Sequence, residues 1–341
     1  MDQISRVGLD IAKQIFHVVA YDDQDGEVRK RMLRRTQVMP FFAQLPPCRV
    51  GIEACASAHH WARQLTQLGH EVVLLPPQHI KPYLRGNKND YNDARAIAEA
   101  MTRPGIRPVA IKTTAQQDQQ AVHRLRQGLI RERTAAANRL RGLLSEYGIV
   151  IPRGIGALRR RLPELMEEAH NGLSMTFRGF LAAEYAHLKS LDAQIKQYED
   201  TIKALAHQEA DFARLLTIPG FGPISASAFV AYVHDPGCYR RGRDVAAALG
   251  LVPRQHSSGG KERLLGISKR GDAYLRSLLV HGARAVVRVA EHKADPLSRW
   301  VNTVRARRGI HKATVALANK MARMGWAVLA QGTQYQARPA G

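Results

Sequence analysis

Cysteines, acidic residues and long apolar runs are all scarce in this sequence. The three cysteines, Cys48, Cys55 and Cys238, are odd in number and widely spaced, which excludes a disulfide framework and fits no zinc site. No apolar run reaches the roughly 18 residues that a membrane-spanning helix needs. The first residues also lack the pattern of a signal peptide. We therefore expect a protein of the reducing cytoplasm.

The shortage of acids leaves a large excess of positive charge. The 341 residues contain 51 Lys and Arg but only 29 Asp and Glu, so the net charge is +22 and the pI is near 10.5. Such a chain attracts polyanions. Nucleic acid is the first expected partner, and an anionic membrane surface is the second. The length is sufficient for two or three domains.

Residues 1–112 alternate between strand and helix patterns, which predicts an α/β domain with helices packed on a mixed sheet. A helix ended by glycine is expected over residues 59–69. Another helix is expected to begin near residue 90. The expected strands are residues 5–10, the segment FHVVAYD, residues 27–33, residues 48–54 and residues 70–77.

From residue 113 to residue 210 the pattern becomes helical. Long helices are expected over residues 115–147 and 174–208. The second carries apolar residues at heptad spacing, which favours a coiled coil, within the chain or between chains. An amphipathic helix packed on its own domain gives the same periodicity and remains an alternative. The heptad residues are Leu188, Leu191, Ile195, Tyr198, Ile202 and Leu205.

A small, mainly α-helical domain is expected over residues 211–330, followed by a disordered tail over residues 331–341. The domain opens with the turn TIPGFGP, before an apolar helix that reaches residue 233. This turn has the composition of a helix-hairpin-helix, which offers backbone amides to DNA phosphates. A structural turn between two helices is the alternative.

Four acids in the first domain form a candidate metal site. Asp10 and Glu53 each follow a short apolar run and should lie at strand ends, where α/β sheets place their sites. Asp90 and Asp93 are three residues apart near a helix start, so they share one helix face. Clustered carboxylates repel one another unless cations compensate them, and they suit Mg²⁺ or Mn²⁺. A carboxylate site holding two metal ions about 3.5–4 Å apart is a common device for phosphodiester chemistry.

Each of these acids also has a purely structural interpretation. Asp90 can serve as a helix N-cap, and Asp93 can favour the positive end of the helix dipole. Asp10 can be a turn residue, and Glu53 can pair with a basic side chain. The combination of all four in so basic a chain favours the metal site.

A second cluster lies in residues 250–276. Ser257 and Ser258 precede two glycines, so the backbone there can approach a ligand closely. A serine hydroxyl in a basic loop can attack a phosphodiester or donate a hydrogen bond to a phosphate. A solvated Ser/Gly loop is the structural alternative. The surrounding cations are Lys261, Arg263, Lys269 and Arg270.

Further cations are candidate contacts to nucleic acid. Lys269 and Arg270 are expected at the start of a helix, where a phosphate would also meet helix amides. Lys88 lies in the Gly/Asn loop before the two aspartates. The first long helix carries arginines that either follow a nucleic-acid backbone or form a solvated face: Arg124, Arg126, Arg131, Arg133, Arg139 and Arg141.

Several ordered motifs resemble those of the insertion-sequence transposases of family 110, the DEDD-type recombinases. The resemblance covers nearly the whole chain. It rests on GLDIAK around Asp10, GIEA around Glu53 and GNKNDYNDA around Asp90 and Asp93. In the second half it rests on IPGFGP, ALGLVP, SSGG and ISKRGDAYLR. One departure is that Cys55 and Ala56 stand where the family often has Thr-Gly.

The resemblance implies a RuvC-like N-terminal domain with an RNase H-type fold. Asp10, Glu53, Asp90 and Asp93 match its metal-binding tetrad, which implies Mg²⁺ or Mn²⁺. A helical coiled-coil segment and a C-terminal transposase domain would follow. Ser258 matches the family's nucleophile, which forms a covalent link to DNA.

The family is also similar to recombinases guided by a noncoding bridge RNA that pairs with target and donor DNA. Its members assemble as dimers and tetramers, in which the serine of one protomer can complete the RuvC-like site of another. A nucleoid-associated enzyme is therefore expected. Two alternatives remain: a RuvC-like structure-selective nuclease that uses water, and a non-catalytic nucleic-acid-binding protein.

Overall fold

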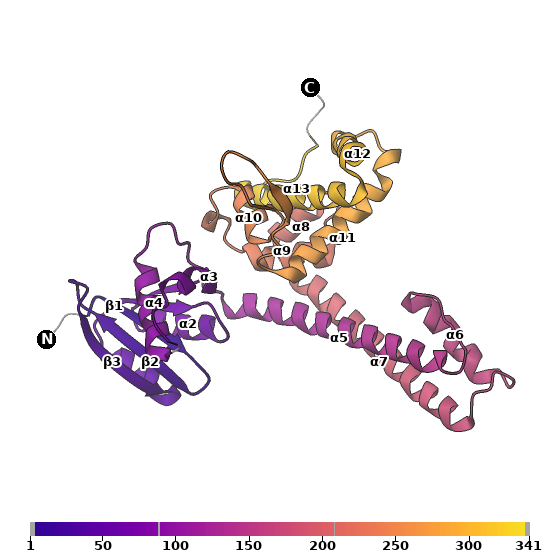
Figure 1. Cartoon of the computed structure of the whole chain (residues 1–341), viewed down its shortest axis with the longest axis horizontal. Coiled ribbons are helices and arrows are strands. Elements are labelled where there is room, and N and C mark those ends of the chain that lie inside the picture. Colours follow the sequence, from indigo (N-terminus) through magenta and orange to yellow (C-terminus); the bar gives the residue numbers. More distant parts are fainter. Residues whose placement is uncertain (1–3, 88, 208, 338–341) are drawn as a thin grey trace. The chain divides into compact units, whose positions relative to one another are not determined.

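The computed structural model describes residues 4–87, 89–207 and 209–337. The chain forms two compact units, Met1–Ala115 and Gln116–Gly341 (Figure 1). Lys88, one of the candidate DNA contacts, lies outside the described residues, as do the last four residues of the expected tail. No helix in the described part of the chain is long and apolar enough to cross a bilayer.

The first unit is built on a mixed five-stranded sheet, which confirms the expected α/β class. The strand order is β3-β2-β1-β4-β5. The pairs β1–β2 and β2–β3 are antiparallel, whereas β1–β4 and β4–β5 are parallel. The strands are β1 (Arg6–Ile11), β2 (Ile15–Tyr21), β3 (Glu27–Arg34), β4 (Arg49–Glu53) and β5 (Glu71–Leu75).

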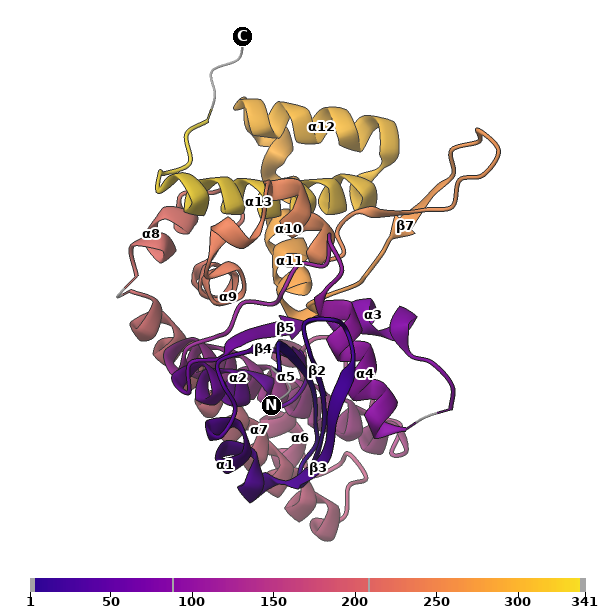
Figure 2. The same ribbon diagram turned by 90° about the vertical axis from the view of Figure 1, so that its left-hand side faces the viewer.

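Helices cover both faces of this sheet (Figure 2). On one face, α1 (Val38–Ala43) and α2 (Ala58–Gln67) enclose a core that includes Phe16, Phe42 and Trp61. On the other face, α4 (Asp90–Met101) packs on β1, β2 and β4. The short helix α3 (Pro77–Ile80) follows β5.

Two glycines allow α4 to lie directly on the sheet. A Cβ atom at Gly8 of β1 would stand 2.0 Å from the carbonyl oxygen of Ala94. A Cβ at Gly51 of β4 would stand 3.0 Å from Cγ2 of Ile97. Side chains two residues apart on a strand share a face. Asp10 and Glu53, each two residues beyond one of these glycines, therefore face the side on which α4 lies.

The second unit opens with two long helices, α5 (Thr114–Ser145) and α7 (Met175–Ala206), with α6 (Ile155–Glu167) between them in sequence. Four of the six heptad residues of α7 are buried: Leu188, Leu191, Ile195 and Ile202. Leu188 belongs to a core shared with Leu140 of α5 and Leu162 of α6. At least this part of the apolar stripe is therefore covered by the chain itself.

Ion pairs show that α5 and α7 run antiparallel, because later residues of α5 pair with earlier residues of α7. Arg126 pairs with Glu199, Arg133 with Asp192, and Arg139 with Glu184. These three arginines therefore bind acids of the partner helix, which corrects their interpretation as a face free to follow nucleic acid. Arg124 and Arg131, two further candidate contacts to nucleic acid on α5, are exposed.

The rest of the second unit is a helical bundle with its own core, as expected. Phe212, Phe229, Leu279 and Met321 lie in that core. His123 of α5 connects to the bundle through hydrogen bonds between its ring nitrogens and the hydroxyls of Tyr274 and Ser227. The helices are α8 (Ala210–Leu216), α9 (Pro223–Val233), α10 (Gly242–Ala248), α11 (Ala273–Val289), α12 (Pro296–Arg308) and α13 (Ile310–Gln331).

The TIPGFGP turn joins α8 to α9 and packs inside this bundle. A Cβ at Gly282 of α11 would stand 2.0 Å from the carbonyl oxygen of Gly220. Ile218 and Phe221 are both buried. These contacts favour the interpretation as a structural turn between two helices.

Candidate active site

The sheet brings the first two acids side by side. Asp10 is the penultimate residue of β1, and Glu53 is the last residue of β4. The two strands are parallel neighbours with Leu9 opposite Ile52, so the acids follow at the same level of the sheet. Asp90 and Asp93 lie in the first turn of α4, on the same face of the sheet.

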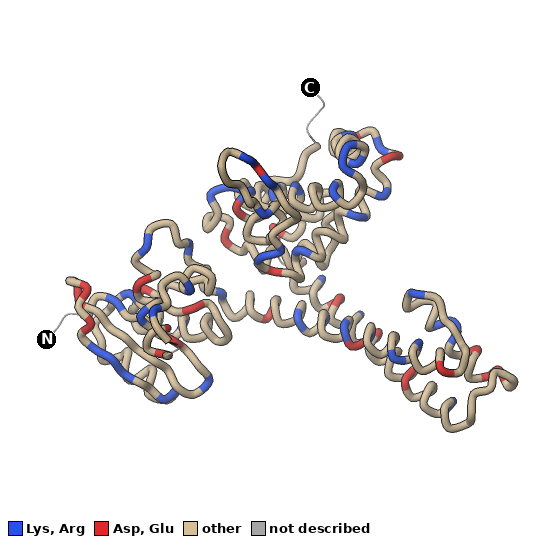
Figure 3. The backbone as a smooth tube through the Cα atoms, in the orientation of Figure 1, with Lys and Arg blue, Asp and Glu red and all other residues tan. Residues whose placement is uncertain are grey.

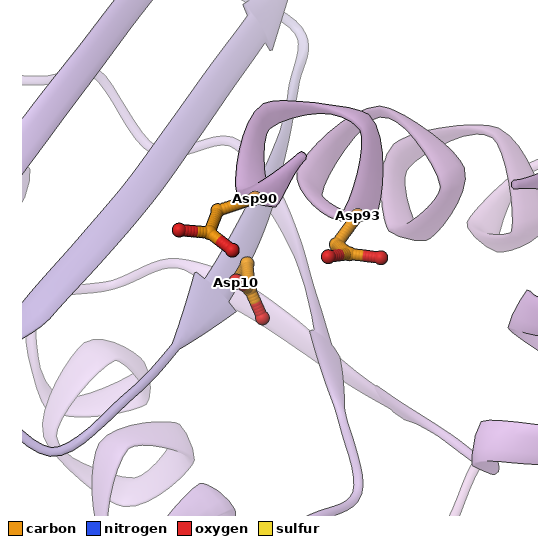
Figure 4. A group of neighbouring side chains, drawn as sticks. All are labelled: Asp10, Asp90 and Asp93. Atoms are coloured by element: carbon orange, nitrogen blue, oxygen red, sulfur yellow. The ribbon is translucent and has the colours of Figure 1, made fainter. Parts of the chain in front are cut away.

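Three of the four acids form a tight group (Figure 4). One carboxylate oxygen from each of Asp10, Asp90 and Asp93 lies within 4.8 Å of the others. Glu53 stands beside this group rather than in it, although its charge acts on Asp10. The structure therefore brings three of the four predicted metal-binding acids together and leaves Glu53 outside that group.

The alternative in which Asp90 caps α4 is wrong. Asn89 precedes the helix with an extended backbone, and its side-chain oxygen accepts a hydrogen bond of 2.9 Å from the backbone N–H of Tyr91. Asp90 is therefore the first helical residue, and its carboxylate is not used as the cap. This leaves it available to face Asp10, as Figure 4 shows.

The electrostatics reflect the crowding of these acids. Burial, followed by the charges of Asp93, Asp90 and Glu53, raises the pKa of Asp10 to about 6. Burial and the charge of Asp93 raise the pKa of Glu53, while Lys81 opposes the shift. Ionisation of these carboxyls is therefore unfavourable in the folded chain, and a bound cation would stabilise their charged form.

His17 belongs to this site, and sequence reasoning missed it. It pairs across the sheet with Asp10 and is buried. Its Nδ1 lies 3.7 Å from Oδ2 of Asp90, and its ring packs edge-on against Tyr91 with 4.7 Å between centroids. The signal in the sequence was a single polar residue inside the apolar strand FHVVAYD.

Cys55 occupies the position at which the sequence departs from the family pattern. Its backbone N–H donates a 2.8 Å hydrogen bond to the carbonyl oxygen of Glu53. Burial, then the charges of Glu53 and Asp10, raise the pKa of the Cys55 thiol. The thiol is therefore neutral beside the acids, and α2 begins three residues later at Ala58.

The serines lie on a β-hairpin that was not predicted from the sequence. Strands β6 (Pro253–Gln255) and β7 (Leu264–Ile267) pair antiparallel. Between them, Gly259 and Gly260 have φ values of 55° and 76°, which favour glycine. The segment is therefore a paired hairpin with a glycine turn, rather than only a solvated loop.

The two serines of the hairpin differ in their hydrogen bonds. The Ser257 hydroxyl accepts hydrogen bonds from the backbone N–H of Arg263, at 3.2 Å, and from Nε2 of Gln255, at 3.1 Å. Ser258 uses its backbone carbonyl, which accepts from the N–H of Lys261 at 3.1 Å. Within the described residues, no hydrogen bond engages the Ser258 hydroxyl, and this residue is exposed. Lys261 and Arg263, two of the candidate phosphate contacts, are exposed on the same hairpin.

The base of the hairpin is packed against the bundle. A Cβ at Gly271 would stand 1.8 Å from the carbonyl oxygen of Ala248, and one at Gly250 would stand 2.3 Å from that of Arg270. Arg276 donates to the carbonyl oxygens of Leu249 and Arg270. The motifs ALGLVP and ISKRGDAYLR thus meet where the hairpin leaves the bundle.

The expectation that Lys269 and Arg270 open a helix is wrong. Helix α11 begins at Ala273, and its N-cap Asp272 accepts a 2.8 Å hydrogen bond from the N–H of Leu275. An acidic side chain therefore already occupies the helix terminus. Lys269 and Arg270 are exposed in the preceding loop.

Comparisons with known proteins match both halves of the chain to transposases. A model described as "Transposase IS116/IS110/IS902 family" matches residues 212–297, and a DEDD-type IS110 transposase model matches residues 7–149. A probable family 20 transposase of Pseudomonas aeruginosa is 48% identical over 98% of this chain and 99% of its own length. The transposase for insertion sequence element IS1111A of Coxiella burnetii is 43% identical, over 98% and 92%. The transposase for element IS1328 of Yersinia enterocolitica is 40% identical, over 98% and 99%. The four acids lie inside the region matched by the second model, and part of the helical bundle lies inside the region matched by the first. These matches, together with relatives that align over nearly the whole chain, show that the chain belongs to the IS110 family of transposases.

Proposed function

We propose that this transposase excises and inserts its mobile element through metal-dependent DNA cleavage and a covalent serine–DNA intermediate. The observation that carries the proposal is the close group formed by Asp10, Asp90 and Asp93. The exposed Ser258 hydroxyl on a basic hairpin supports the second part. The mixed sheet, with acids at the ends of adjacent parallel strands, supports a RuvC-like domain of RNase H type.

The acids suit a divalent cation. Their oxygens are hard ligands of the kind that Mg²⁺ or Mn²⁺ prefers. Asp10, Asp90 and Asp93 would hold the ion, with Glu53 as the adjacent fourth ligand. A bound ion would supply charge stabilisation to the phosphodiester in the transition state. His17, close to Asp90, would help to hold that carboxylate toward Asp10.

Ser258 would act as the nucleophile. Its Oγ would form a bond to the phosphorus of a DNA phosphodiester while the bond from phosphorus to one of its ester oxygens breaks. The hydroxyl proton leaves Oγ, and the departing sugar hydroxyl gains a proton, so the step balances without any other reactant. Lys261 and Arg263, on the same hairpin, would bind neighbouring phosphates.

A noncoding bridge RNA encoded by the element would guide the enzyme, and dimers or tetramers would assemble on DNA. The net charge of +22 supports the binding of more than one polyanion. The exposed Arg124 and Arg131 of α5 are candidate contacts.

The test is an adduct assay on the full chain with Mg²⁺, labelled DNA of the element end, and RNA transcribed from the noncoding DNA beside the gene. We expect Ser258→Ala to abolish the covalent protein–DNA adduct. Ser257→Ala is the matched control, because it removes a neighbouring hydroxyl that serves the hairpin, and we expect it to retain the adduct. The reverse result would move the nucleophile to Ser257. Adduct formation by both variants would exclude a serine mechanism, and free 5′-phosphate ends without attached protein would indicate a water-using nuclease.

A further inference from the structure

The row of side chains that contains Asp10 continues across the sheet to its edge. Asp10 pairs with His17 on β2, and His17 pairs with Met32 on β3. Directly paired residues of neighbouring strands point to the same face. Met32 therefore lies on the face that carries the acids, and 61% of its surface is exposed although it is a large apolar residue.

Two cations flank Met32 on this face. Lys30 and Arg34 are each two residues away from it and share its side of the strand. Both are exposed. We call Lys30, Met32 and Arg34 the β3 strip. At about 3.3 Å per residue, its two cations are about 13 Å apart along the strand.

The opposite face of β3 has a different role. Leu33 is buried in the core beneath α1 and α2. Arg29 and Arg31 share its face and are exposed. The same strand thus carries two exposed cations on each side, and only one side faces the acids. Figure 3 shows the dense positive charge along this strand.

The β3 strip is held by the helix that carries Asp90 and Asp93. Nζ of Lys30 lies 4.0 Å from the centre of the Tyr91 ring, directly after Asp90. Arg95 of α4 makes two hydrogen bonds, of 2.8 and 3.0 Å, to the carboxylate of Glu27 at the start of β3. These contacts fix the strip relative to the acid group, as a preformed binding surface requires.

We propose that the β3 strip seats the DNA strand whose phosphodiester is presented to Asp10, Asp90 and Asp93. The proposal rests on the proposed function, because it assigns that strand to the acid group. A phosphate backbone is repelled by acids alone, so it needs cations close by. Lys30 and Arg34 supply them in the row next to the acids, and Met32 offers an apolar surface for a sugar or base between two phosphates. Continuity with Asp10 favours the cleaved DNA strand as the occupant.

The experiment compares two double variants of the full chain in EDTA. Lys30→Ala with Arg34→Ala removes the cations of the strip, and Arg29→Ala with Arg31→Ala removes the same charge from the other face of the same strand. The probes are a fluorescent single-stranded DNA and an RNA of the same sequence, and anisotropy is followed over a salt series. The slope of log K against log salt is negative, and each lost contact to single-stranded nucleic acid reduces its magnitude by about 0.7.

We expect the strip variant to reduce the magnitude of the slope for DNA by about 1.4, and the control variant to leave the slope unchanged. Equal losses in both variants would show that only bulk charge matters and would overturn the proposal. A loss confined to RNA would assign the strip to the guide and would also overturn it. Unchanged DNA binding together with an altered sedimentation coefficient would assign the strip to a second copy of the chain. Neither metal nor cleavage enters this readout, so its failure is distinct from failure of the adduct assay.

Discussion

At the scale of single residues, the site is defined by carboxylates that are close enough to disturb one another. The pKa of Asp10 is raised to about 6, because this residue is partly buried and lies near three other acids. Its raised pKa means that ionisation is more costly in the folded chain than in the unfolded one. Folding stability should therefore fall as the pH rises toward this raised pKa, which gives a test of the site that does not depend on DNA.

Without metal, Asp10→Asn should melt at a higher temperature than the natural chain at pH 7 and at the same temperature near pH 4. Below the ordinary pKa of 3.8 the carboxyl is protonated in both states and costs nothing. Between about pH 4 and 6 the unfolded chain ionises first, so folding stability falls, and above pH 6 the full cost is present. Differential scanning calorimetry in EDTA measures the difference, which should be a few °C.

Adding Mg²⁺ provides the control for this prediction. The ion should raise the melting temperature of the natural chain at pH 7, because it binds the folded state alone. The rise should be much smaller for Asp10→Asn, which lacks a central ligand. Equal melting temperatures at pH 7 without metal would contradict the raised pKa of Asp10.

At the scale of elements, the site depends on how closely α4 approaches the sheet. The acids could be chosen from the sequence because each ends an apolar strand or begins a helix. In the sequence, the glycines of GLD and GIE are recognisable only as parts of motifs. Their function is visible once Ala94 and Ile97 are seen above them.

Gly8→Ala should therefore damage both stability and cleavage. The new Cβ would meet the carbonyl oxygen of Ala94 at 2.0 Å, and a backbone atom cannot turn aside. The helix must shift, at a cost of about 1–3 kcal/mol or more, and Asp90 and Asp93 would move away from Asp10. Thermal melting and the adduct assay should both register the loss.

Gly142→Ala is the matched control for this glycine. It lies inside α5, is exposed, and has nothing within 4 Å of an added Cβ. Alanine is favoured over glycine within a helix by about 1 kcal/mol, so this variant should be at least as stable as the natural chain. If Gly8→Ala melted and cleaved like Gly142→Ala, α4 would not pack on the sheet as described.

Other elements show why sequence patterns alone were insufficient. The spacing of arginines on α5 is compatible with a nucleic-acid face, but Arg126 and Arg133 pair with acids on α7 that lie 73 and 59 positions away in the chain. The β6–β7 hairpin escaped prediction because its strands are short and exposed. The mixed sheet and the long helices were predictable because their apolar periodicity is local. The β3 strip was not, because cross-strand register decides which of its cations face the acids.

At the scale of the whole molecule, the proposed chemistry uses groups from both compact units. The acids lie in Met1–Ala115, and Ser258 lies in Gln116–Gly341. A recombinase that joins exchanged strands benefits if each strand is cut where two protomers meet, because cleavage then requires assembly. The resemblance to the family implies an assembly of this kind, in which the serine of one protomer would complete the acid group of another.

This arrangement predicts complementation between two inactive chains. Asp10→Asn keeps Ser258, and Ser258→Ala keeps the acids. Neither should form the adduct alone, but a mixture should contain dimers in which the serine of the first chain meets the acids of the second. Random pairing of equal amounts places one such composite site in half of the dimers, so adduct should return at about a quarter of the level per site in the natural chain. A size tag on the Asp10→Asn chain identifies it on a denaturing gel, and all of the adduct should migrate with that chain. If the mixture remained inactive while each purified variant still assembled on DNA, the serine and the acids would act within one protomer.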